Sequence, residues 1–372
     1  MKKLYFVFDQ LPDKGDGGLI ATYINLYYLL KEKYDIHVIS VFNFEKNTTP
    51  FSDSKIHVVN NHVIDNRFYK MFSYISKLDF KKFGKAFCSL FTYFFTIKTN
   101  RKKIKKIINN DDYVVVSCPS AGIFMPSDID FITEIHTSYN YFFGNNILGK
   151  MQAKLMTTPK LTLFRTKYDA EHAPKYLNPS YIYNFFDNSN IVRSKNIVKN
   201  KLCFVGRIED IKDPLRLIDI AKKLFEKNKN FELDIYGDGS LSQQCKDKIN
   251  ELNLSKIVHM KGYTNNKNIY ANYSASLLTS KFEGFPMSII ESKANGIPTI
   301  TTRFGDSVLE MISNNKDGFV CESDDEFVEK TNELLTDDKL LTKMSENAYK
   351  SFNHFSKERA YNNWIKILEN YK

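Results

Sequence analysis

Cysteine is scarce in this 372-residue sequence, and its distribution excludes two common ways of stabilising a fold. The five cysteines are scattered along the chain and form no Cys-x-x-Cys pair. An odd number of isolated cysteines argues against a disulfide framework and against a zinc ribbon. We therefore expect a reducing, cytoplasmic environment. The residues concerned are Cys88, Cys118, Cys203, Cys245 and Cys321.

Long apolar runs are also missing. No run reaches the roughly 18 residues that a membrane-spanning helix needs, and the longest candidate, 86–97, is too short. The stretch 4–8 runs into Asp9, so it does not predict a signal peptide. Acidic residues are outnumbered, and the net charge of +10 is compatible with an acidic partner or surface. No nucleic-acid-binding module is recognisable, so we expect no nucleic-acid partner.

The length predicts two domains, and strands alternate with helices in both halves. This alternation predicts an α/β fold with two doubly wound parallel sheets. We expect a Rossmann-like domain at 1–185, a polar linker at 186–198, a second Rossmann-like domain at 199–354 and a terminal helix at 355–372. The expected strands are 4–9, 36–42, 55–60, 114–117, 131–135, 160–165 and 181–185, then 202–205, 232–236, 257–261, 275–279, 298–301 and 319–321.

A glycine-rich loop, Gly-Asp-Gly-Gly at 15–18, follows the first strand and precedes a helical pattern. Strand, glycine loop and helix form a phosphate-binding arrangement. The dinucleotide fingerprint is not matched, because Ile20 replaces its last glycine and no acidic residue ends the strand 36–42. A nicotinamide enzyme is therefore disfavoured. Glycines that merely turn the chain remain an alternative.

Two carboxylates accompany the start of a helix within 280–296. Pro286 suits the first helical position, where its missing N–H costs nothing, and Gly296 suits the helix stop. Glu283 lies just before this helix, and Glu291 lies inside it. The N-terminus of a helix favours anions, so we expect an anionic ligand with hydroxyl groups on either side. On spacing alone, one solvated glutamate and one glutamate that interacts with the helix dipole are an equal alternative.

Two cations follow the first strand of the second domain. Arg207 comes directly after Gly206, and Lys212 precedes Asp213-Pro214, a helix cap with a first-position proline. Arginine offers a bidentate fork and lysine a mobile point charge, and both suit phosphate. Fixed cations would stabilise the charge that develops as a diphosphate departs. Two solvated surface charges are the alternative.

The run from Glu283 through Gly284, Phe285 and Pro286 to Met287 resembles the Glu–seven residues–Glu motif of retaining nucleotide-sugar glycosyltransferases with the GT-B fold, the large family numbered four. The resemblance covers most of the chain and is strongest from residue 200 to 320. It implies two Rossmann-like domains facing a cleft, with the terminal helix crossing back to the first. It also implies transfer of a hexosyl group from a nucleotide diphosphate sugar to an acceptor hydroxyl with retention, without metal or other cofactor. We expect a UDP-sugar rather than a GDP-sugar.

The resemblance also assigns roles. Glu283 contacts the donor sugar near its reacting face, and Glu291 accepts hydrogen bonds from the ribose. Arg207 and Lys212 neutralise the diphosphate; glycine usually follows this lysine, so Asp213 is a departure. No general base is implied, because a leaving phosphate oxygen is thought to take the acceptor proton.

His136 follows the strand 131–135, where a lone histidine is more often structural, but the family places a sugar-contacting histidine at this strand end. Tyr139 is a further candidate. Gly17 and Gly18 would approach the acceptor and the donor phosphates, and the strand ends at Gly237 and Tyr263 would border the base. The predicted catalytic residues are Glu283, His136, Arg207 and Lys212. The predicted donor site comprises Gly17, Gly18, Gly206, Arg207, Lys212, Gly237, Tyr263, Glu283, Gly284, Phe285, Pro286, Met287 and Glu291.

Two other functions are weighed against this one. A metal-dependent transferase would need an Asp-x-Asp pair, and Asp128 and Asp130 supply it. These residues follow Pro126-Ser127, however, which is typical of a turn. A non-catalytic GT-B partner subunit would bind without transferring, and the intact motif residues argue against it. By analogy, the acceptor is a carbohydrate or a lipid-linked group in the synthesis of a bacterial surface polysaccharide, teichoic acid or glycolipid.

The segment 67–106 is strongly basic and aromatic. Twelve Lys or Arg stand against one acid, Asp79, for a net charge of +11, and eleven aromatic residues are interleaved. Such a surface suits an anionic membrane. We expect a peripheral protein on the inner face of the plasma membrane, docked through this segment. The alternative is two ordinary amphipathic helices whose aromatic rings face the core and whose lysines are solvated.

Overall fold

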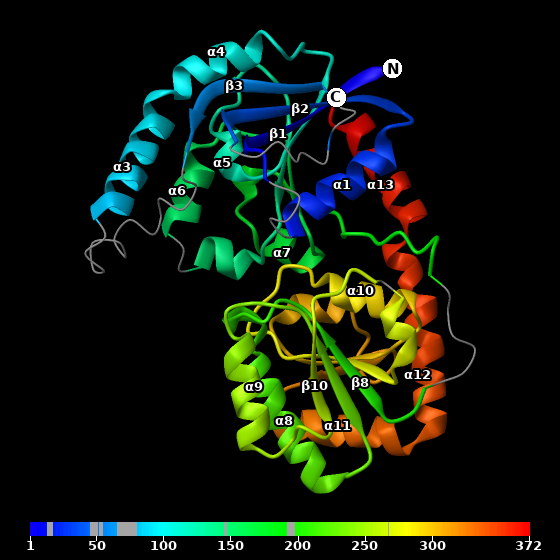
Figure 1. Ribbon diagram of the computed structural model, residues 1–372. Coiled ribbons are helices and arrows are strands. Elements are labelled where there is room, and N and C mark those ends of the chain that lie inside the picture. Colours follow the sequence, from blue (N-terminus) through cyan, green and yellow to red (C-terminus); the bar gives the residue numbers. More distant parts are fainter. Residues whose placement is uncertain are drawn as a thin grey trace. The chain divides into compact units, whose positions relative to one another are not determined.

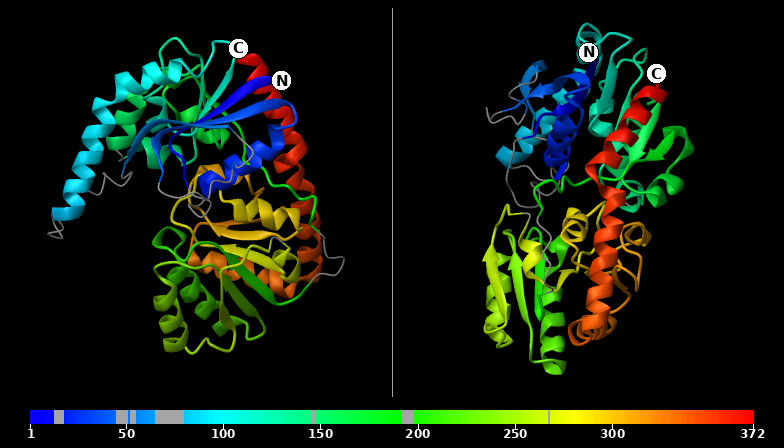
Figure 2. Two further views of the ribbon diagram at one scale, coloured as in Figure 1. Left: turned by 45° about the horizontal axis from the view of Figure 1, so that its top comes forward. Right: turned by 90° about the vertical axis from the view of Figure 1, so that its right-hand side faces the viewer.

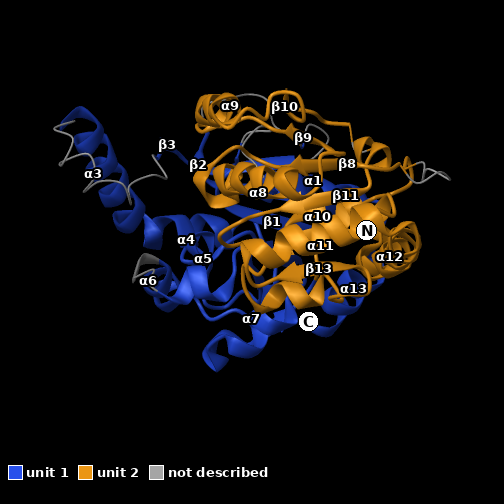
Figure 3. Ribbon diagram, turned by 90° about the horizontal axis from the view of Figure 1, so that it is seen from below, with its two compact units in different colours: residues 1–182, 361–372 blue, residues 183–360 orange. Residues whose placement is uncertain are grey.

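The computed structural model divides the chain into two compact units (Figures 1 and 3). Unit 1 comprises residues 1–182 and 361–372, and unit 2 comprises residues 183–360. The structure describes residues 1–12, 18–44, 51, 55–64, 80–144, 147–191, 198–266 and 268–372. Of the predicted site residues, Gly17 lies outside these ranges, as does the part of the basic segment up to residue 79.

Unit 1 is built on a parallel sheet of seven strands in the order β3-β2-β1-β4-β5-β6-β7. The first strand is buried from residue 4 to residue 8, because helices cover both faces of such a sheet and the strand needs no polar face. The strands are β1 (Lys2–Gln10), β2 (Tyr34–Asn43), β3 (Lys55–Val63), β4 (Tyr113–Val116), β5 (Ile132–Ile135), β6 (Leu161–Phe164) and β7 (Pro179–Tyr181).

The strand expected at 181–185 is wrong, since β7 ends at Tyr181. The apolar residues that follow pack in unit 2 instead. Tyr183 stacks on Phe285 with ring centroids 5.8 Å apart, and Phe186 is buried in the core of unit 2. The apolar run therefore reflects burial at a domain boundary and not a strand.

The helices of unit 1 place apolar residues at helical spacing against the sheet. In α1 the buried side chains of Ile20, Tyr23, Leu26 and Leu30 recur every three or four residues. α3 projects from the body of the unit in the left view of Figure 2. The helices are α1 (Gly18–Leu30), α3 (Phe80–Phe95), α4 (Ile97–Lys105), α5 (Pro119–Gly122), α6 (Ile147–Leu155) and α7 (Lys167–His172), with a π turn at Asn140–Gly144 and a 3-10 turn, η3, at Lys175–Leu177.

The terminal helix α13 (Lys357–Asn370) begins in unit 2 and ends in unit 1. Near its end, Glu369 pairs with Lys33 at 2.8 Å. The Val114 N–H donates to the hydroxyl of Tyr371 at 2.7 Å. The prediction that the terminal helix returns to the first domain is confirmed.

Unit 2 contains a second parallel sheet, of six strands in the order β10-β9-β8-β11-β12-β13. Crossovers between parallel strands are right-handed, so the reversal of direction at β8 and β11 places α8 and α9 on one face and α10 on the other. The strands are β8 (Lys201–Val205), β9 (Glu232–Tyr236), β10 (Val258–Gly262), β11 (Ala275–Leu278), β12 (Thr299–Thr302) and β13 (Gly318–Cys321). The predicted α/β class with two doubly wound sheets is confirmed.

The helices of unit 2 enclose one hydrophobic core with the sheet, and α8 and α10 contribute fully buried residues such as Leu217 and Ile290. The helices are α8 (Pro214–Lys227), α9 (Ser242–Glu251), α10 (Met287–Ala294), α11 (Asp324–Thr336) and α12 (Asp338–Ser351). Short 3-10 turns are η4 (Asp210–Lys212), η5 (Ile269–Asn272), η6 (Asp306–Glu310) and η7 (Phe352–Phe355). Among the described residues, no helix combines the length and the apolar character that a membrane span requires.

Candidate active site

The reversal of strand order in unit 2 brings two predicted site loops together. β8 and β11 are neighbours that pair in parallel. Doubly wound sheets bind ligands at the carboxyl ends of such a strand pair. The loop after β8 carries Arg207 and Lys212, and the loop after β11 carries Glu283. The topology thus places both loops at the edge where a ligand is expected.

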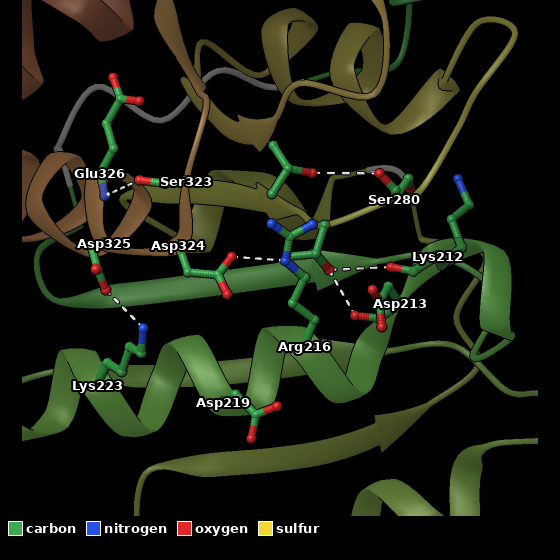
Figure 4. A network of polar contacts seen from close by, with 12 residues as sticks. Lys212, Asp213, Arg216, Asp219, Lys223, Ser280, Ser323, Asp324, Asp325 and Glu326 are labelled. Carbon is green, nitrogen blue, oxygen red and sulfur yellow. Dashed lines mark hydrogen bonds and ion pairs between the residues drawn. The ribbon is translucent and has the colours of Figure 1, made fainter.

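Hydrogen bonds tie these two loops to each other. The hydroxyl of Thr279 donates to the carbonyl oxygens of Lys212 and Asp213, at 3.2 and 3.0 Å (Figure 4). The Lys281 N–H donates to the Ile211 carbonyl oxygen at 2.9 Å. The backbone around Lys212 is therefore fixed relative to the loop that carries Glu283.

Two predicted catalytic side chains, those of Lys212 and Glu283, are in direct contact. The Lys212 ammonium donates a hydrogen bond to the Oε1 atom of Glu283, and the hydroxyl of Ser280 donates to the same oxygen at 2.6 Å. The two charged side chains are only 14% and 13% exposed. An ammonium group has three donors, so Lys212 keeps protons for a second anionic partner. Ser280 was not predicted; its position immediately after a buried strand was the only signal.

The backbone conformation of Asp213 explains why glycine usually stands at this position after the lysine. Its backbone is left-handed, with φ 47° and ψ 54°, a conformation that costs a non-glycine residue roughly 1–2 kcal/mol. Glycine avoids this cost, which gives a physical reason for the usual glycine. Asp213 occupies the N-cap position of α8, but its side chain makes no capping hydrogen bond, so that part of the prediction is wrong. Pro214 opens the helix as predicted.

Two ion pairs, one in the first turn of α8 and one near its end, hold this helix against α11 (Figure 4). Arg216 contacts Asp324 at 2.7 Å, and Lys223 contacts Asp325 at the same distance. Ser323 caps α11 by accepting a hydrogen bond from the Glu326 N–H at 3.2 Å. The N-terminal end of α8, and with it Lys212, is therefore anchored by groups that do not belong to the site.

Glycines at three neighbouring strand ends form a close-packed edge. The Gly206 N–H donates to the carbonyl oxygen of Tyr236 at 3.0 Å, and the Gly237 N–H donates to that of Gly262 at 2.9 Å. Gly237 has φ 142°, and a Cβ atom there would lie 1.8 Å from the Gly206 carbonyl oxygen. Only glycine fits at position 237. Glycine is therefore required at position 237 for steric reasons, whether or not this residue borders a ligand.

Arg207 and Tyr263 lie at the same edge with exposed side chains. Arg207 is exposed, and Tyr263 is 79% exposed. No ion pair holds Arg207 within the described residues. Both side chains are thus available for a ligand.

Helix α10 starts one residue later than predicted. Pro286 is its N-cap, with φ −68° and ψ 112°, and Met287 is the first helical residue. The extended ψ of Pro286 places it outside the helix, which explains the shift. Gly296, with φ 74°, follows the C-cap Asn295 and ends the helix as predicted.

Glu291 and Phe285 are both buried, with different consequences. Glu291 is 6% exposed, and the hydroxyl of Tyr270 lies 3.3 Å from its Oε2 atom. Burial and the Glu291 charge raise the pKa of Tyr270, so this phenol stays a hydrogen-bond donor. Phe285 is 7% exposed and packs on Tyr183 and Phe355, so only its backbone can reach a ligand. Met287 is half-buried, and Gly284 is partly exposed.

In unit 1, His136 belongs to a buried charged cluster at the ends of β5 and β6. Two nitrogens of the Arg165 guanidinium lie 3.3 and 3.0 Å from the ring nitrogens of His136, and Arg165 also contacts the Glu134 carboxylate. Burial lowers the pKa of His136, and the Arg165 charge lowers it further. Burial alone would raise the pKa of Glu134, but Arg165 and His136 outweigh it and hold that pKa at about 2. The imidazole is therefore neutral and oriented.

Sequence reasoning missed Glu134 and Arg165, although a charged residue inside an apolar strand was a usable signal. Tyr139 is held by its backbone, because its N–H donates to Asp169 at 2.8 Å. Gly18 is exposed and is the first residue of α1.

The side-chain geometry gives the Asp-x-Asp alternative no support: Asp128 pairs with Lys105, and Asp130 with Lys160 at 3.6 Å. No set of three potential metal ligands is grouped within the described parts of the chain.

Comparison with known proteins agrees with this architecture. Residues 187–351 match the model of the family described as glycosyl transferases group 1. The chain is 24% identical over 389 residues to a poly(ribitol-phosphate) alpha-N-acetylglucosaminyltransferase of Staphylococcus aureus, covering 94% of this chain and 77% of that protein. It is 26% identical over 175 residues to a poly(glycerol-phosphate) alpha-glucosyltransferase of Bacillus subtilis; this match covers 46% of this chain and only 26% of the relative.

A solved structure shows the same fold over the whole chain. A mutant of Staphylococcus aureus TarM, in complex with Fondaparinux, alpha-GlcNAc-glycerol and UDP, superposes with a TM-score of 0.75 at 15% identity, covering 99% of this chain and 100% of that one. At this identity the likeness establishes the fold, which is GT-B. The matching family model and both relatives are named for glycosyl transfer.

Proposed function

We propose that the protein transfers a hexosyl group from a UDP-sugar to an acceptor hydroxyl with retention of configuration. The observation that carries the proposal is the contact of Lys212 and Ser280 with Glu283 at the carboxyl ends of β8 and β11. This contact holds an anion and a cation at the edge of the sheet where a donor would bind. The Staphylococcus aureus relative, named for α-N-acetylglucosaminyl transfer to poly(ribitol phosphate), supports a sugar donor and a teichoic-acid type of acceptor.

In the proposed complex the donor diphosphate lies by Lys212, Arg207 and the N-terminus of α10. Lys212 and Arg207 would stabilise the charge that develops as the diphosphate leaves. Glu283 would then orient the sugar, and Glu291, kept in place by Tyr270, would accept hydrogen bonds from the ribose. The backbone N–H groups of Gly284, Phe285 and Met287 and the helix dipole would add to anion binding.

In unit 1, neutral His136 would contact the donor sugar, as the resemblance implies. Arg165 and Glu134 fix its ring. No metal is required in this proposal, because fixed cations and a helix terminus take the place of one. Complete loss of activity with a chelator, with recovery on addition of manganese, would favour the Asp128–Asp130 alternative.

The decisive experiment measures donor hydrolysis and transfer across a panel of UDP- and GDP-sugars. We expect turnover with a UDP-hexose, and NMR of the product should show the same anomeric configuration as the donor. Glu283→Gln should abolish most turnover, whereas Glu329→Gln, an exposed glutamate on α11, serves as the matched control and should not. Binding of UDP without turnover of any donor would instead support a non-catalytic partner subunit.

We further propose that α3 docks on an anionic membrane surface. Five phenylalanines of this helix are exposed: Phe80 67%, Phe87 51%, Phe91 53%, Phe94 38% and Phe95 71%. At 3.6 residues per turn these positions fall on one stripe, opposite the buried Ala86, Ser89 and Tyr93. In the described part of α3, Tyr93 faces the core as the alternative expects, but these five phenylalanine rings do not.

Exposed cations on α3 and around α4 complement an anionic surface. Lys81 and Lys85 are exposed on α3, and Lys102 and Lys106 are exposed on and just after α4. Each basic residue near an anionic leaflet contributes about 1 kcal/mol. Two further lysines are engaged within unit 1, because Lys103 donates to the Val59 carbonyl oxygen at 2.9 Å and Lys105 pairs with Asp128.

Vesicle sedimentation tests the docking. The parent protein should bind phosphatidylglycerol vesicles more tightly than phosphatidylcholine vesicles, and added salt should weaken this binding. Changing Phe87, Phe91 and Phe95 to Ser should weaken it too. So should changing Lys81, Lys85, Lys102 and Lys106 to Glu, whereas the same change at Lys246, Lys256, Lys339 and Lys343 of unit 2 should have little effect. Equal binding to both vesicles, or an α3 stripe that only mediates dimerisation, would contradict the proposal.

A further inference from the structure

A half-buried carboxylate, Asp9, lies at the switch point of the sheet in unit 1. β1 pairs with β2 on one side and with β4 on the other. The chain builds the sheet outward from β1 to β3, then returns to β4 and builds in the opposite direction. Crevices at such a point, at the carboxyl ends of the strands, are where doubly wound sheets take ligands. Asp9 stands near the end of β1, and Ser120 belongs to α5, which follows β4.

Hydrogen bonds hold the Asp9 carboxylate in place without neutralising it. The hydroxyl of Ser120 donates to Oδ2 at 2.8 Å, and the Gln10 N–H donates to Oδ1 at 2.8 Å. The Ser120 hydroxyl also lies 3.0 Å from the Cys118 sulfur. Within the described residues no lysine, arginine or histidine forms an ion pair with Asp9. A carboxylate has about four acceptor positions, so the two donors leave Asp9 able to accept more.

The surroundings of Asp9 are those of a functional group more than of a structural one. Burial raises the pKa of Asp9, and hydrogen bonds from Ser120 and Gln10 only partly offset this. Burial also raises the pKa of the Cys118 thiol to about 11, so no thiolate lies beside it. A carboxylate without an ion pair, held by two donors at a strand end beside the switch point, is a candidate for substrate contact.

The same edge of the sheet carries His136. The strands β1, β4 and β5 are consecutive in the sheet, and all run parallel. Their carboxyl ends therefore bring Asp9, Ser120 and His136 to one side of unit 1. A group bound by Asp9 would lie near the residue that the proposed function places at the sugar.

We propose that Asp9, held by Ser120, binds a hydroxyl group of the acceptor. This inference rests on the proposed function and deepens it by naming the acceptor chemistry at unit 1. A carboxylate without a cation accepts hydrogen bonds from hydroxyl groups and repels phosphate. The part of the acceptor that meets Asp9 is therefore an uncharged sugar or polyol hydroxyl, even if the acceptor carries phosphate elsewhere.

Kinetics of Asp9→Asn separate acceptor binding from donor chemistry. The probes are an alkyl glucoside and a synthetic ribitol-phosphate oligomer, each with a UDP-hexose. Loss of a hydrogen bond to a charged group should raise the acceptor KM by about ten- to a hundredfold. Hydrolysis of the donor by water, which needs no acceptor, should stay within about twofold of the parent. Ser120→Ala should raise the acceptor KM less, because the carboxylate remains.

Asp112→Asn is the matched control. Asp112 is also a buried carboxylate in unit 1, 8% exposed, and accepts a hydrogen bond from the Asn109 N–H at 2.8 Å. It precedes β4, at the opposite edge of the same sheet from Asp9. Asp112→Asn should leave the KM values for both acceptor probes unchanged. Thermal unfolding of both variants shows whether a kinetic change reflects loss of the fold.

Three results would overturn the inference. They are an unchanged acceptor KM in Asp9→Asn, a parallel loss of donor hydrolysis, and an equal effect of Asp112→Asn. If the parent transfers and hydrolyses no sugar, the proposed function fails first. Saturation-transfer NMR with the same two probes then still decides: contacts seen with the parent and lost in Asp9→Asn support the site, and their absence from the parent overturns it.

Discussion

Glu283→Gln should separate turnover from nucleotide binding. In the structure, Glu283 accepts hydrogen bonds from both Lys212 and Ser280. A glutamine of the same shape keeps an acceptor oxygen but loses the negative charge. We expect transfer to fall by a factor of about a hundred or more, the scale for losing one preorganised polar contact.

Binding of UDP should respond in the opposite direction. Lys212 is shared between Glu283 and the proposed diphosphate, and the pair is only 14% and 13% exposed. A hydrogen bond to a charged group is worth about 1.5–3 kcal/mol, and part of that is lost when Lys212 turns to a phosphate. Because Glu283→Gln weakens this competing contact, UDP affinity should stay equal or rise by up to about tenfold.

Isothermal titration with UDP and a transfer assay on the same preparation test this prediction. Lys212→Met is the informative comparison, since it removes the cation and should lower both UDP affinity and turnover. A Glu283→Gln protein that loses UDP affinity in proportion to its turnover would refute the reasoning. Full turnover in the folded variant would remove Glu283 from the site.

Four more predictions follow from individual residues. Glu291→Ala should weaken binding of UDP, because a bidentate acceptor for the ribose is lost; unchanged affinity by calorimetry would make it only a helix residue. Arg207→Ala should weaken binding of UDP more than binding of uridine, and an equal loss for both would contradict the phosphate assignment. Asp213→Gly should leave the free energy of unfolding equal or raise it by up to about 1 kcal/mol, whereas Asp213→Val should lower it by about 1–2 kcal/mol, measured by urea unfolding. Glu134 has a lowered pKa of about 2, so its contribution to stability is full above its unfolded pKa and is lost as the pH falls from there toward 2. Glu134→Gln should therefore make the free energy of unfolding depend less on pH in this acidic range. An unchanged pH dependence would contradict the buried ion pair.

The sequence by itself determined the architecture. Apolar runs of four to seven residues, separated by helical patterns, indicated parallel sheets because such strands are buried on both faces. All six strands of unit 2 lie within one or two residues of their predicted bounds. The sequence also placed Arg207, Lys212 and Glu283 in loops that follow buried strands. In a parallel sheet all such loops lie at the edge formed by the carboxyl ends of the strands, where ligands bind.

Tertiary structure decided how those loops meet. The contact of Lys212 with Glu283, and the part played by Ser280, depend on the pairing of β8 with β11, which are far apart in sequence. The orientation of His136 depends in the same way on Arg165, which directly follows β6, the next strand of the sheet. Periodicity cannot specify such pairs, because it describes one element at a time.

The aromatic segment shows the same limit from the other side. Its composition indicated an amphipathic helix but did not determine which face would be covered. In the structure, Ala86, Ser89 and Tyr93 of α3 are buried, while the phenylalanine stripe remains exposed. Local sequence sets the period of a helix, but only its packing against the rest of unit 1 decides which of two apolar faces the protein buries.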